Sequence, residues 1–404
     1  MRPFKSTLPL DRALTILREA TCPVERTASV SLDAAAGRVL AEDIVAPHDV
    51  PPFDRAAMDG YAVRTADLEH ASAAMPVRLT QIGAAAAGTA EAPAVTRGLC
   101  VTIATGAPLP PGADAVVMVE DTCASPGSCD IEFRAPARPR QHVGARGADL
   151  RAGDTVLRTG DLLTPARVGV LAAIGAPAAT VFVRPRVFLA SSGNEVVPPG
   201  TPLQAAQIHD VNRFTLPAIV TAHGGEPVTH PAVRDTPVAL RAALDAAAGC
   251  DLVVISGGSS VGDHDLLGEV VGERGQVLFH GIAVKPGKPT LLARLGHRQL
   301  LLGMPGNPTS CLSNAYILLI PLLRATARLP AWRPETRRLR LSASVTSAPG
   351  RHQFYPVRIE GEAAVPVFKG SGEITSLGRA DGYFEIPAEV EAVPEGTEVT
   401  VVRF

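Results

Sequence analysis

The middle of the chain repeats one pattern: a short apolar run, a turn rich in serine or glycine, and a stretch with helical spacing. Three runs hold four consecutive apolar or small residues without polar alternation: 187–190, 252–255 and 300–303. Strands buried on both faces of a parallel sheet have this pattern. Because helical stretches separate the runs, the pattern predicts a three-layer α/β domain with a largely parallel sheet.

The flanking residues predict smaller units. Apolar positions in 10–17 recur at helical spacing and predict an amphipathic helix. Between 77 and 135, strand-like runs alternate with glycine and proline, and alternation from 338 onwards predicts a second small β unit. The expected parts are an N-terminal linker domain (1–46 and 147–177), an inserted β-rich module (47–146), the α/β domain (178–327) and a small C-terminal β domain (328–404).

Composition narrows the classes of function. A chain of 404 residues is too long for one core, and a net charge of −2 gives no sign of a nucleic-acid partner. No apolar run is long enough to span a membrane, and residues 1–6 lack the apolar segment of a secretion signal. We therefore expect a cytoplasmic protein with six reduced cysteines and no membrane partner.

The turn after the run at 252–255 carries the first candidate site. Its hydroxyl and backbone donors suit an oxyanion. They belong to Ser256, Gly257, Gly258, Ser259 and Ser260. Asp263 and Asp265 follow at once, and carboxylates beside an anion site require a cation between them, which points to Mg²⁺ that bridges protein and phosphate. The same residues also suit an ordinary glycine-rich turn with solvated aspartates.

Other polar residues share the edge where the strands are expected to end, and ligands of α/β domains gather at that edge. Glu195 follows the run at 187–190. The loop after the run at 300–303 consists of Pro305, Gly306, Asn307 and Pro308. We therefore expect these residues to face the same ligand as the glycine-rich turn.

Two lysines, Lys285 and Lys288, stand on a loop stiffened by prolines and could hold an anion by point charge. The loop is not a Walker A motif, because Ile282 and Pro289 replace the glycine and the Ser/Thr that the motif requires. A solvated basic turn is the alternative. Two further candidates are Asp59, which precedes a glycine and also suits a plain hairpin turn, and the donor-rich loop 370–377.

Five motifs then occur in one order along nearly the whole chain. They begin at Pro51 (Pro-Pro-Phe-Asp-x-x-Ala-Met-Asp-Gly-Tyr-Ala), Thr105 (Thr-Gly-Ala-Pro), Ser256 (Ser-Gly-Gly-x-Ser-Val-Gly-Asp-x-Asp), Lys285 (Lys-Pro-Gly-Lys-Pro) and Pro305 (Pro-Gly-Asn-Pro). In this order the chain resembles the molybdopterin molybdenumtransferases, the molybdenum insertases related to the E domain of gephyrin.

The resemblance implies a homodimer of four-domain subunits, in which the α/β domain of one subunit completes a site against the inserted module of the other. It implies adenylylated molybdopterin and molybdate as substrates and Mg²⁺-dependent release of AMP. The implied catalytic positions are Asp59, Thr105, Asp149, Glu195, Asp235, Asp265 and Lys285. Asp59, Glu195 and Asp265 would position the metal or its waters, Thr105 with Ser259 and Ser260 would bind oxyanion, and Lys288 would join Lys285 on phosphate. The loop 305–308 would shape the pterin side.

Two positions depart from the family pattern. Asn194 stands where an aspartate is common, and Gly281 stands where some members carry a basic residue. Two rival functions remain: a molybdopterin adenylyltransferase, which would not need the Asp59 module or the C-terminal β domain, and a non-catalytic molybdopterin-binding scaffold of the gephyrin type. A molybdopterin adenylyltransferase and molybdoenzyme maturation proteins are the expected partners of an insertase.

Overall fold

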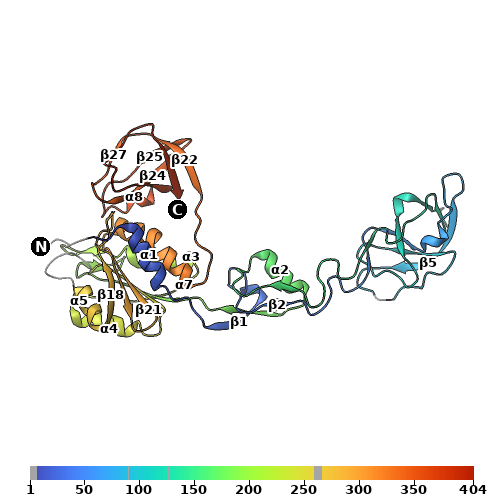
Figure 1. Ribbon diagram of the computed structural model, residues 1–404, viewed down its shortest axis with the longest axis horizontal. Helices are drawn as coiled ribbons and strands as arrows, with labels where there is room; N and C mark the ends of the chain where they lie inside the picture. The colour runs from blue at the N-terminus through green and yellow to red at the C-terminus, as the bar shows by residue number, and fades with distance from the viewer. Residues whose placement is uncertain (1–6, 90, 125–126, 259–265) are drawn as a thin grey trace. The chain divides into compact units, whose positions relative to one another are not determined.

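The chain folds into two compact units in this computed structural model (Figure 1). The structure describes residues 7–89, 91–124, 127–258 and 266–404. The first unit consists of Met1–Ala28, Gly37–Val39 and Thr180–Phe404, and the second of Ser29–Ala36 and Leu40–Ala179. Within the described ranges, no helix is both long and apolar enough to cross a membrane.

A six-stranded sheet forms the centre of the first unit. Its order is β16 (Glu226–Thr229), β13 (Arg186–Ser191), β17 (Leu252–Ser256), β21 (Gln299–Met304), β20 (Leu291–Leu295) and β18 (Gly275–His280). The first four strands are parallel, and β20 runs opposite to both of its neighbours. The predicted, largely parallel sheet is confirmed.

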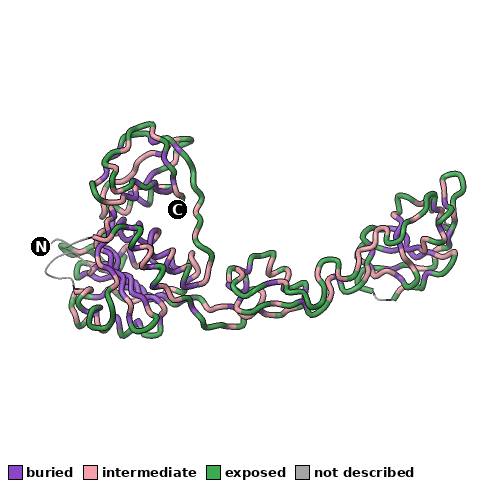
Figure 2. Tube along the Cα trace, viewed as in Figure 1, coloured by how far each residue is buried: buried purple, intermediate pink, exposed green. Residues whose placement is uncertain are grey.

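Helices cover both faces of this sheet, because its central strands are apolar on both sides. Val187 and Val254 belong to one core, whereas Phe188 and Val253 belong to the other. On the first face lie α1 (Leu10–Ala20), α3 (Asn212–Ala222), α6 (Pro308–Asn314) and α7 (Ile320–Thr326); on the second lie α4 (Pro237–Ala246) and α5 (Leu266–Arg274). Figure 2 shows the buried residues concentrated along the sheet between these layers.

Residues 308–326 form three consecutive helical segments. A π-helix, Ala315–Leu319, separates α6 from α7. Pro321 explains the break, because it has no N–H and its ring opposes a regular α-helical ladder. The start of α4 is well capped: the Thr236 hydroxyl accepts from the N–H of Ala239 at 3.2 Å, and Pro237 occupies the first turn.

The C-terminal part of the first unit is a small closed sheet. Strand β24 (His352–Glu360) pairs with both β25 (Ala363–Pro366) and β26 (Gly382–Ile386), and the ring is completed through β22 (Thr336–Leu341) and β28 (Glu398–Arg403). Its interior is apolar, with Leu341, Phe384 and Val401 buried. A two-residue strand from the lysine loop, β19 (Val284–Lys285), joins the same sheet beside β24.

The second unit contains a six-stranded, mostly antiparallel sheet. Its order is β7 (Ala115–Met118), β4 (Gly60–Val63), β6 (Leu99–Ile103), β5 (Val77–Ala85), β9 (Asp130–Phe133) and β8 (Thr122–Ala124). One face packs around Phe133 and the other around Ile103. Outside this sheet lie short strands, including β2 (Ile44–Val45) and β11 (Thr155–Leu157), and helix α2 (Pro165–Ala173). The inserted β-rich module predicted from the sequence is thus present.

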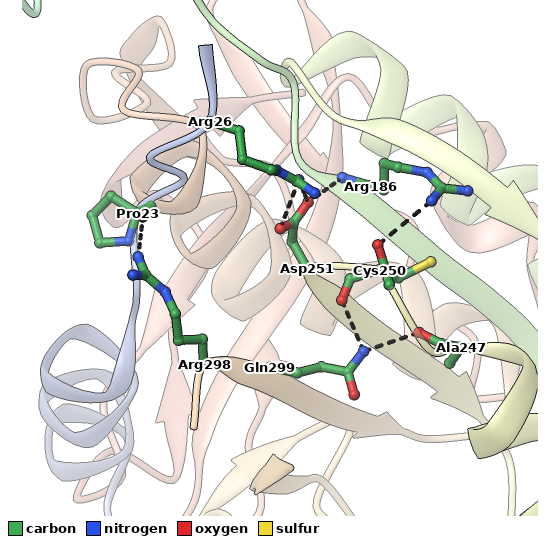
Figure 3. A network of polar contacts seen from close by, with 9 residues as sticks. Pro23, Arg26, Arg186, Ala247, Cys250, Asp251, Arg298 and Gln299 are labelled. Atoms are coloured by element: carbon green, nitrogen blue, oxygen red, sulfur yellow. Dashed lines mark hydrogen bonds and ion pairs between the residues drawn. The ribbon is translucent and has the colours of Figure 1, made fainter. Parts of the chain in front are cut away.

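A polar network fixes the amino ends of the parallel strands in the first unit (Figure 3). Asp251 accepts from the Arg26 guanidinium at 2.7 Å and from the N–H of Arg186 at 2.8 Å. The Gln299 amide donates to the carbonyls of Ala247 and Cys250. These bonds tie the N-terminal segment and three strands together at the edge where the strands begin.

We predict that Asp251→Ala destabilises the first unit by about 1–2 kcal/mol, because it leaves the Arg186 N–H and the guanidinium without their acceptor. Urea unfolding followed by fluorescence measures this, since the single tryptophan, Trp332, packs against the core of the first unit. Asp245→Ala is the control: it removes a solvent-exposed ion pair with Arg274 and should leave the unfolding midpoint nearly unchanged. Equal effects of the two variants would contradict the prediction.

Candidate functional site

A cavity of about 980 Å³ opens where the parallel strands of the first unit end. Its floor is formed by the residues that finish or follow β13, β17 and β21. Of the residues predicted from the sequence, it is lined by Glu195, Asp235, Ser256, Gly257, Gly258, Lys285, Lys288, Pro305, Gly306, Asn307 and Pro308. One edge of one sheet therefore brings together the glycine turn, the lysine loop and the Pro305–Pro308 loop.

The remaining predicted residues lie elsewhere. Ser259, Ser260 and Asp265 fall outside the described residues. Asp59, Thr105 and Asp149 belong to the second unit.

Glycine is required where the strand-end loops touch. Gly257 has φ +93°, and a Cβ there would lie 2.2 Å from the carbonyl oxygen of Ser192. The Gly257 N–H donates to the carbonyl of Met304 at 2.9 Å. A Cβ on Gly306 would lie 3.3 Å from the Cα of Gly257. The loops after β13, β17 and β21 thus meet backbone against backbone, which leaves their polar groups to face the cavity.

Carboxylates and hydroxyls form one wall of the cavity. Asp210 is only 5% exposed and accepts from the hydroxyl of Ser191 at 2.8 Å and from the N–H of Arg213 at 2.9 Å. Asp235 accepts from the hydroxyl of Ser192. The Ser256 hydroxyl donates to Ser191 at 3.4 Å, so this predicted oxyanion donor also takes part in the wall's own network.

Sequence reasoning missed Asp210, which precedes α3 at the same edge of the sheet. The signal was available: an acidic residue two positions before a helix of an α/β domain, near the edge where ligands gather. Ser191 and Ser192 carried a different signal, since they directly follow the apolar run at 187–190.

Cationic groups form another part of the lining. Lys285 and Lys288 are joined there by Arg351, which directly precedes β24, and by Lys369, which follows β25. The loop 370–377 also contributes, because Asn307 donates to the Ser371 hydroxyl at 3.0 Å. Arg351 and Lys369 carried no local signal in the sequence, since only the folding of the C-terminal sheet brings them to this cavity.

Asn194, one of the two departures from the family pattern, has a definite contact. Its side-chain oxygen accepts from the N–H of Asp235 at 3.3 Å. A carboxylate in its place could accept the same bond, so the asparagine keeps the contact and removes one negative charge from the carboxylate wall.

The donor set of this wall suits a hard cation such as Mg²⁺, because Glu195, Asp210 and Asp235 all offer oxygen. Among the described residues, no three His, Cys, Asp or Glu side chains form a ready-made metal site. Mg²⁺ commonly takes only one or two carboxylates and completes its shell with water and substrate phosphates. The wall is therefore compatible with Mg²⁺ that arrives with a phosphate substrate.

Asp59 has well-defined partners in the second unit. It precedes β4, and Thr105 follows the neighbouring antiparallel strand β6, so the two residues meet at one end of the sheet. Asp59 accepts from the N–H of Thr105 at 2.7 Å and from its hydroxyl at 2.9 Å. These two bonds hold the pKa of Asp59 below its usual value, and the bond from the backbone N–H contributes most. Thr105, predicted to bind an oxyanion, thus donates to Asp59 here.

The segment around Asp59 is also fixed by ion pairs. Asp54 accepts from the Arg140 guanidinium and from the N–H of Arg146, which together lower its pKa to about 2. Nearby, the N–H of Asp149 donates to the carbonyl of Val50 at 3.0 Å. Asp59 therefore lies in a loop whose backbone is anchored on both sides.

Three family descriptions together match most of the chain. They are MoeA N-terminal region (domain I and II) over residues 8–175, probable molybdopterin binding domain over 189–325, and MoeA C-terminal region (domain IV) over 338–404. Molybdopterin molybdenumtransferase 2 of Mycobacterium tuberculosis is 37% identical, with 93% of this chain and 95% of the relative covered. The chain belongs to the molybdopterin molybdenumtransferase family. The family's Haemophilus influenzae member is 33% identical, with 98% of both chains covered.

A solved structure agrees with this assignment. The molybdopterin biosynthesis MoeA protein from Pyrococcus horikoshii is 40% identical, with 98% of this chain and 99% of that one covered, at a TM-score of 0.85. The family resemblance and the multidomain fold inferred from the sequence are thereby confirmed.

We predict that Thr105→Ala raises the pKa of Asp59 part of the way towards its usual value, because the backbone bond remains. Carbon-13 NMR titration of the carboxyl groups measures this. In the wild type the lowered pKa means that these bonds stabilise the fold at neutral pH and are lost as the pH falls through that value. Thr122→Ala is the control, because the Thr122 hydroxyl donates to the carbonyl of Val119 and not to Asp59. An unchanged Asp59 pKa in Thr105→Ala would show that the Thr105 hydroxyl does not lower that pKa.

Proposed function

We propose that the chain inserts molybdenum from molybdate into adenylylated molybdopterin and releases AMP, with the cavity of the first unit as its substrate site. Membership of the family makes the chain a transferase of molybdenum cofactor biosynthesis. The finer assignment rests on one observation: cationic and carboxylate groups line the same cavity at the strand ends. A substrate that carries two phosphates and meets a second oxyanion requires such a lining.

Release of AMP requires hydrolysis of a phosphoanhydride. Water supplies an oxygen to the adenylyl phosphorus, the bond to the bridging oxygen breaks, and the pterin keeps its own phosphate. Negative charge grows on the leaving phosphate, and Lys285 and Lys288 would offset it. The loop of Pro305–Pro308 would enclose the pterin. No cysteine is among the described residues that line the cavity, so the dithiolene sulfurs of the substrate would ligate molybdenum.

Glu195 and Asp235 would hold Mg²⁺ together with substrate oxygens, and Asp265 would contribute as well. When bound, the cation would supply charge neutralisation at the phosphates. The seryl network behind the wall keeps Asp235 in place, since Ser192 donates to it. The family motif supports a catalytic role for Asp59, and the variant Asp59→Asn tests this role.

The regions that flank the α/β domain favour an insertase over an adenylyltransferase. They match the families described as MoeA N-terminal region and MoeA C-terminal region. Arg351 and Lys369 lie in the second of these regions and line the cavity, so the C-terminal region would take part in substrate binding.

The test is release of AMP from adenylylated molybdopterin with Mg²⁺, with and without molybdate. We expect release that depends on molybdate and that falls strongly in Asp59→Asn and Asp265→Asn. Tight binding of the substrate without AMP release under any oxyanion would overturn the proposal and leave a binding scaffold. Formation of adenylylated molybdopterin from ATP would indicate an adenylyltransferase instead.

We predict that Lys285→Ala lowers kcat/KM at least about tenfold, which corresponds to roughly 1.4 kcal/mol of lost transition-state stabilisation. The control is Arg338→Ala, an exposed residue that pairs only loosely with Glu398 and does not line the cavity. The steady-state rate of AMP release measures both variants. Equal kinetics for Lys285→Ala and wild type would exclude this lysine from the reaction.

A further inference from the structure

The lysine loop is held from behind by a buried polar cluster. Asn314, at the end of α6, donates through its amide nitrogen to the carbonyl of Gly287 at 3.0 Å and to the hydroxyl of Thr290 at 2.6 Å. The Thr290 hydroxyl in turn donates to the same carbonyl at 2.8 Å. Asn314 and Thr290 are both fully buried. Three hydrogen bonds thus meet within a few ångströms on the protein side of the loop.

This amide is costly in its surroundings. Its helical neighbours Cys311, Ala315 and Leu318 are buried members of the apolar core. The side-chain oxygen of Asn314 has no hydrogen-bond partner among the described residues, and an unsatisfied buried acceptor costs about 1–3 kcal/mol. An apolar side chain would fill the space without this cost, so the benefit of the amide lies in the two bonds that it donates.

Those bonds act on the peptide that precedes Lys288. The carbonyl of Gly287 and the N and Cα atoms of Lys288 share one planar peptide, so fixing the carbonyl fixes the N–Cα bond from which the Lys288 side chain departs. On its other side, the Lys288 carbonyl accepts from the N–H groups of Ile282 at 3.0 Å and Thr290 at 2.9 Å. The backbone of Lys288 is therefore held before and after its Cα.

The fit between helix and loop is close. Gly287 has φ +111°, and a Cβ at this position would lie 2.3 Å from the side-chain oxygen of Asn314. The loop can therefore approach α6 this closely only with glycine, and it contacts the amide directly. Upstream, Lys285 pairs with Gln353 of β24, so the start of the loop is also fixed.

We propose that Asn314 is a positioning residue: through the Gly287 carbonyl it sets the orientation of Lys288 and so the affinity of the cavity for an oxyanion. This rests on the proposed function only in that Lys288 binds an oxyanion. Asn314 is not among the residues that line the cavity, and it acts through the loop. The oxyanion is either molybdate or a substrate phosphate, and the two are tested separately.

The test compares Asn314→Leu, Lys288→Ala and the double variant in full-length protein. Calorimetry gives the Kd for molybdate alone and for inorganic phosphate alone, and AMP release gives KM and kcat. Asn314→Leu is expected to weaken the binding of the same oxyanion that Lys288→Ala affects, with a Kd about tenfold higher. It should also raise KM more than it lowers kcat. In the Lys288→Ala background, Asn314→Leu should have no further effect, because its influence passes through that lysine.

Thr326→Val is the matched control for loss of a buried hydrogen bond. Thr326 lies in α7, is 2% exposed and donates to the carbonyl of Leu322 at 2.8 Å, away from the loop. It should leave oxyanion affinity unchanged, whereas Asn314→Leu should weaken it, and this difference separates an effect on the loop from the loss of any buried hydrogen bond.

Three results would overturn the proposal: additive losses in the double variant, normal affinity in Asn314→Leu, or no loss of oxyanion affinity in Lys288→Ala. A wild-type protein that binds oxyanion but releases no AMP would sink the proposed function, while the comparison of Kd values would still decide the role of Asn314.

Discussion

Burial of the central sheet on both faces is the constraint on which the rest of the first unit depends. Strands such as β17 have no solvent-facing side, so the polar side chains next to the central strands lie at the strand ends. At the amino edge these groups form the network around Asp251 and Gln299. At the carboxyl edge they line the cavity. One edge is closed by ion pairs and carbonyl acceptors within the protein, and the other remains open to a ligand.

The parts of the fold with a strong local pattern could be predicted from the sequence. The double-sided apolar runs predicted the parallel sheet, and the alternation from 338 onwards predicted the C-terminal β unit. The π-helix between α6 and α7 has no separate signal in the sequence, because the run of apolar residues continues through it. Pattern alone thus recovers which elements exist better than how one helix is divided.

The candidate site divides in the same way. Glu195, Lys285 and the Pro305–Pro308 loop could be found because each follows an apolar run or sits on a loop with an evident chemical bias. Arg351 and Lys369 could not be found, because their place in the cavity depends on the folding of a separate sheet. The role of Asn314 could not be predicted for another reason. A single amide in an apolar helix gives no signal in the sequence until its partner, the carbonyl of Gly287, is known.

Strand β19 links the lysine loop to two domains at once. The loop belongs by sequence to the α/β domain, yet its first two residues, Val284 and Lys285, complete the edge of the C-terminal sheet beside β24. A boundary drawn between these two domains along the chain would cut through a shared hydrogen-bond ladder. The α/β domain could therefore not be transferred alone, in evolution or by engineering, with its anion-binding loop intact. The transferred segment would have to include the C-terminal sheet.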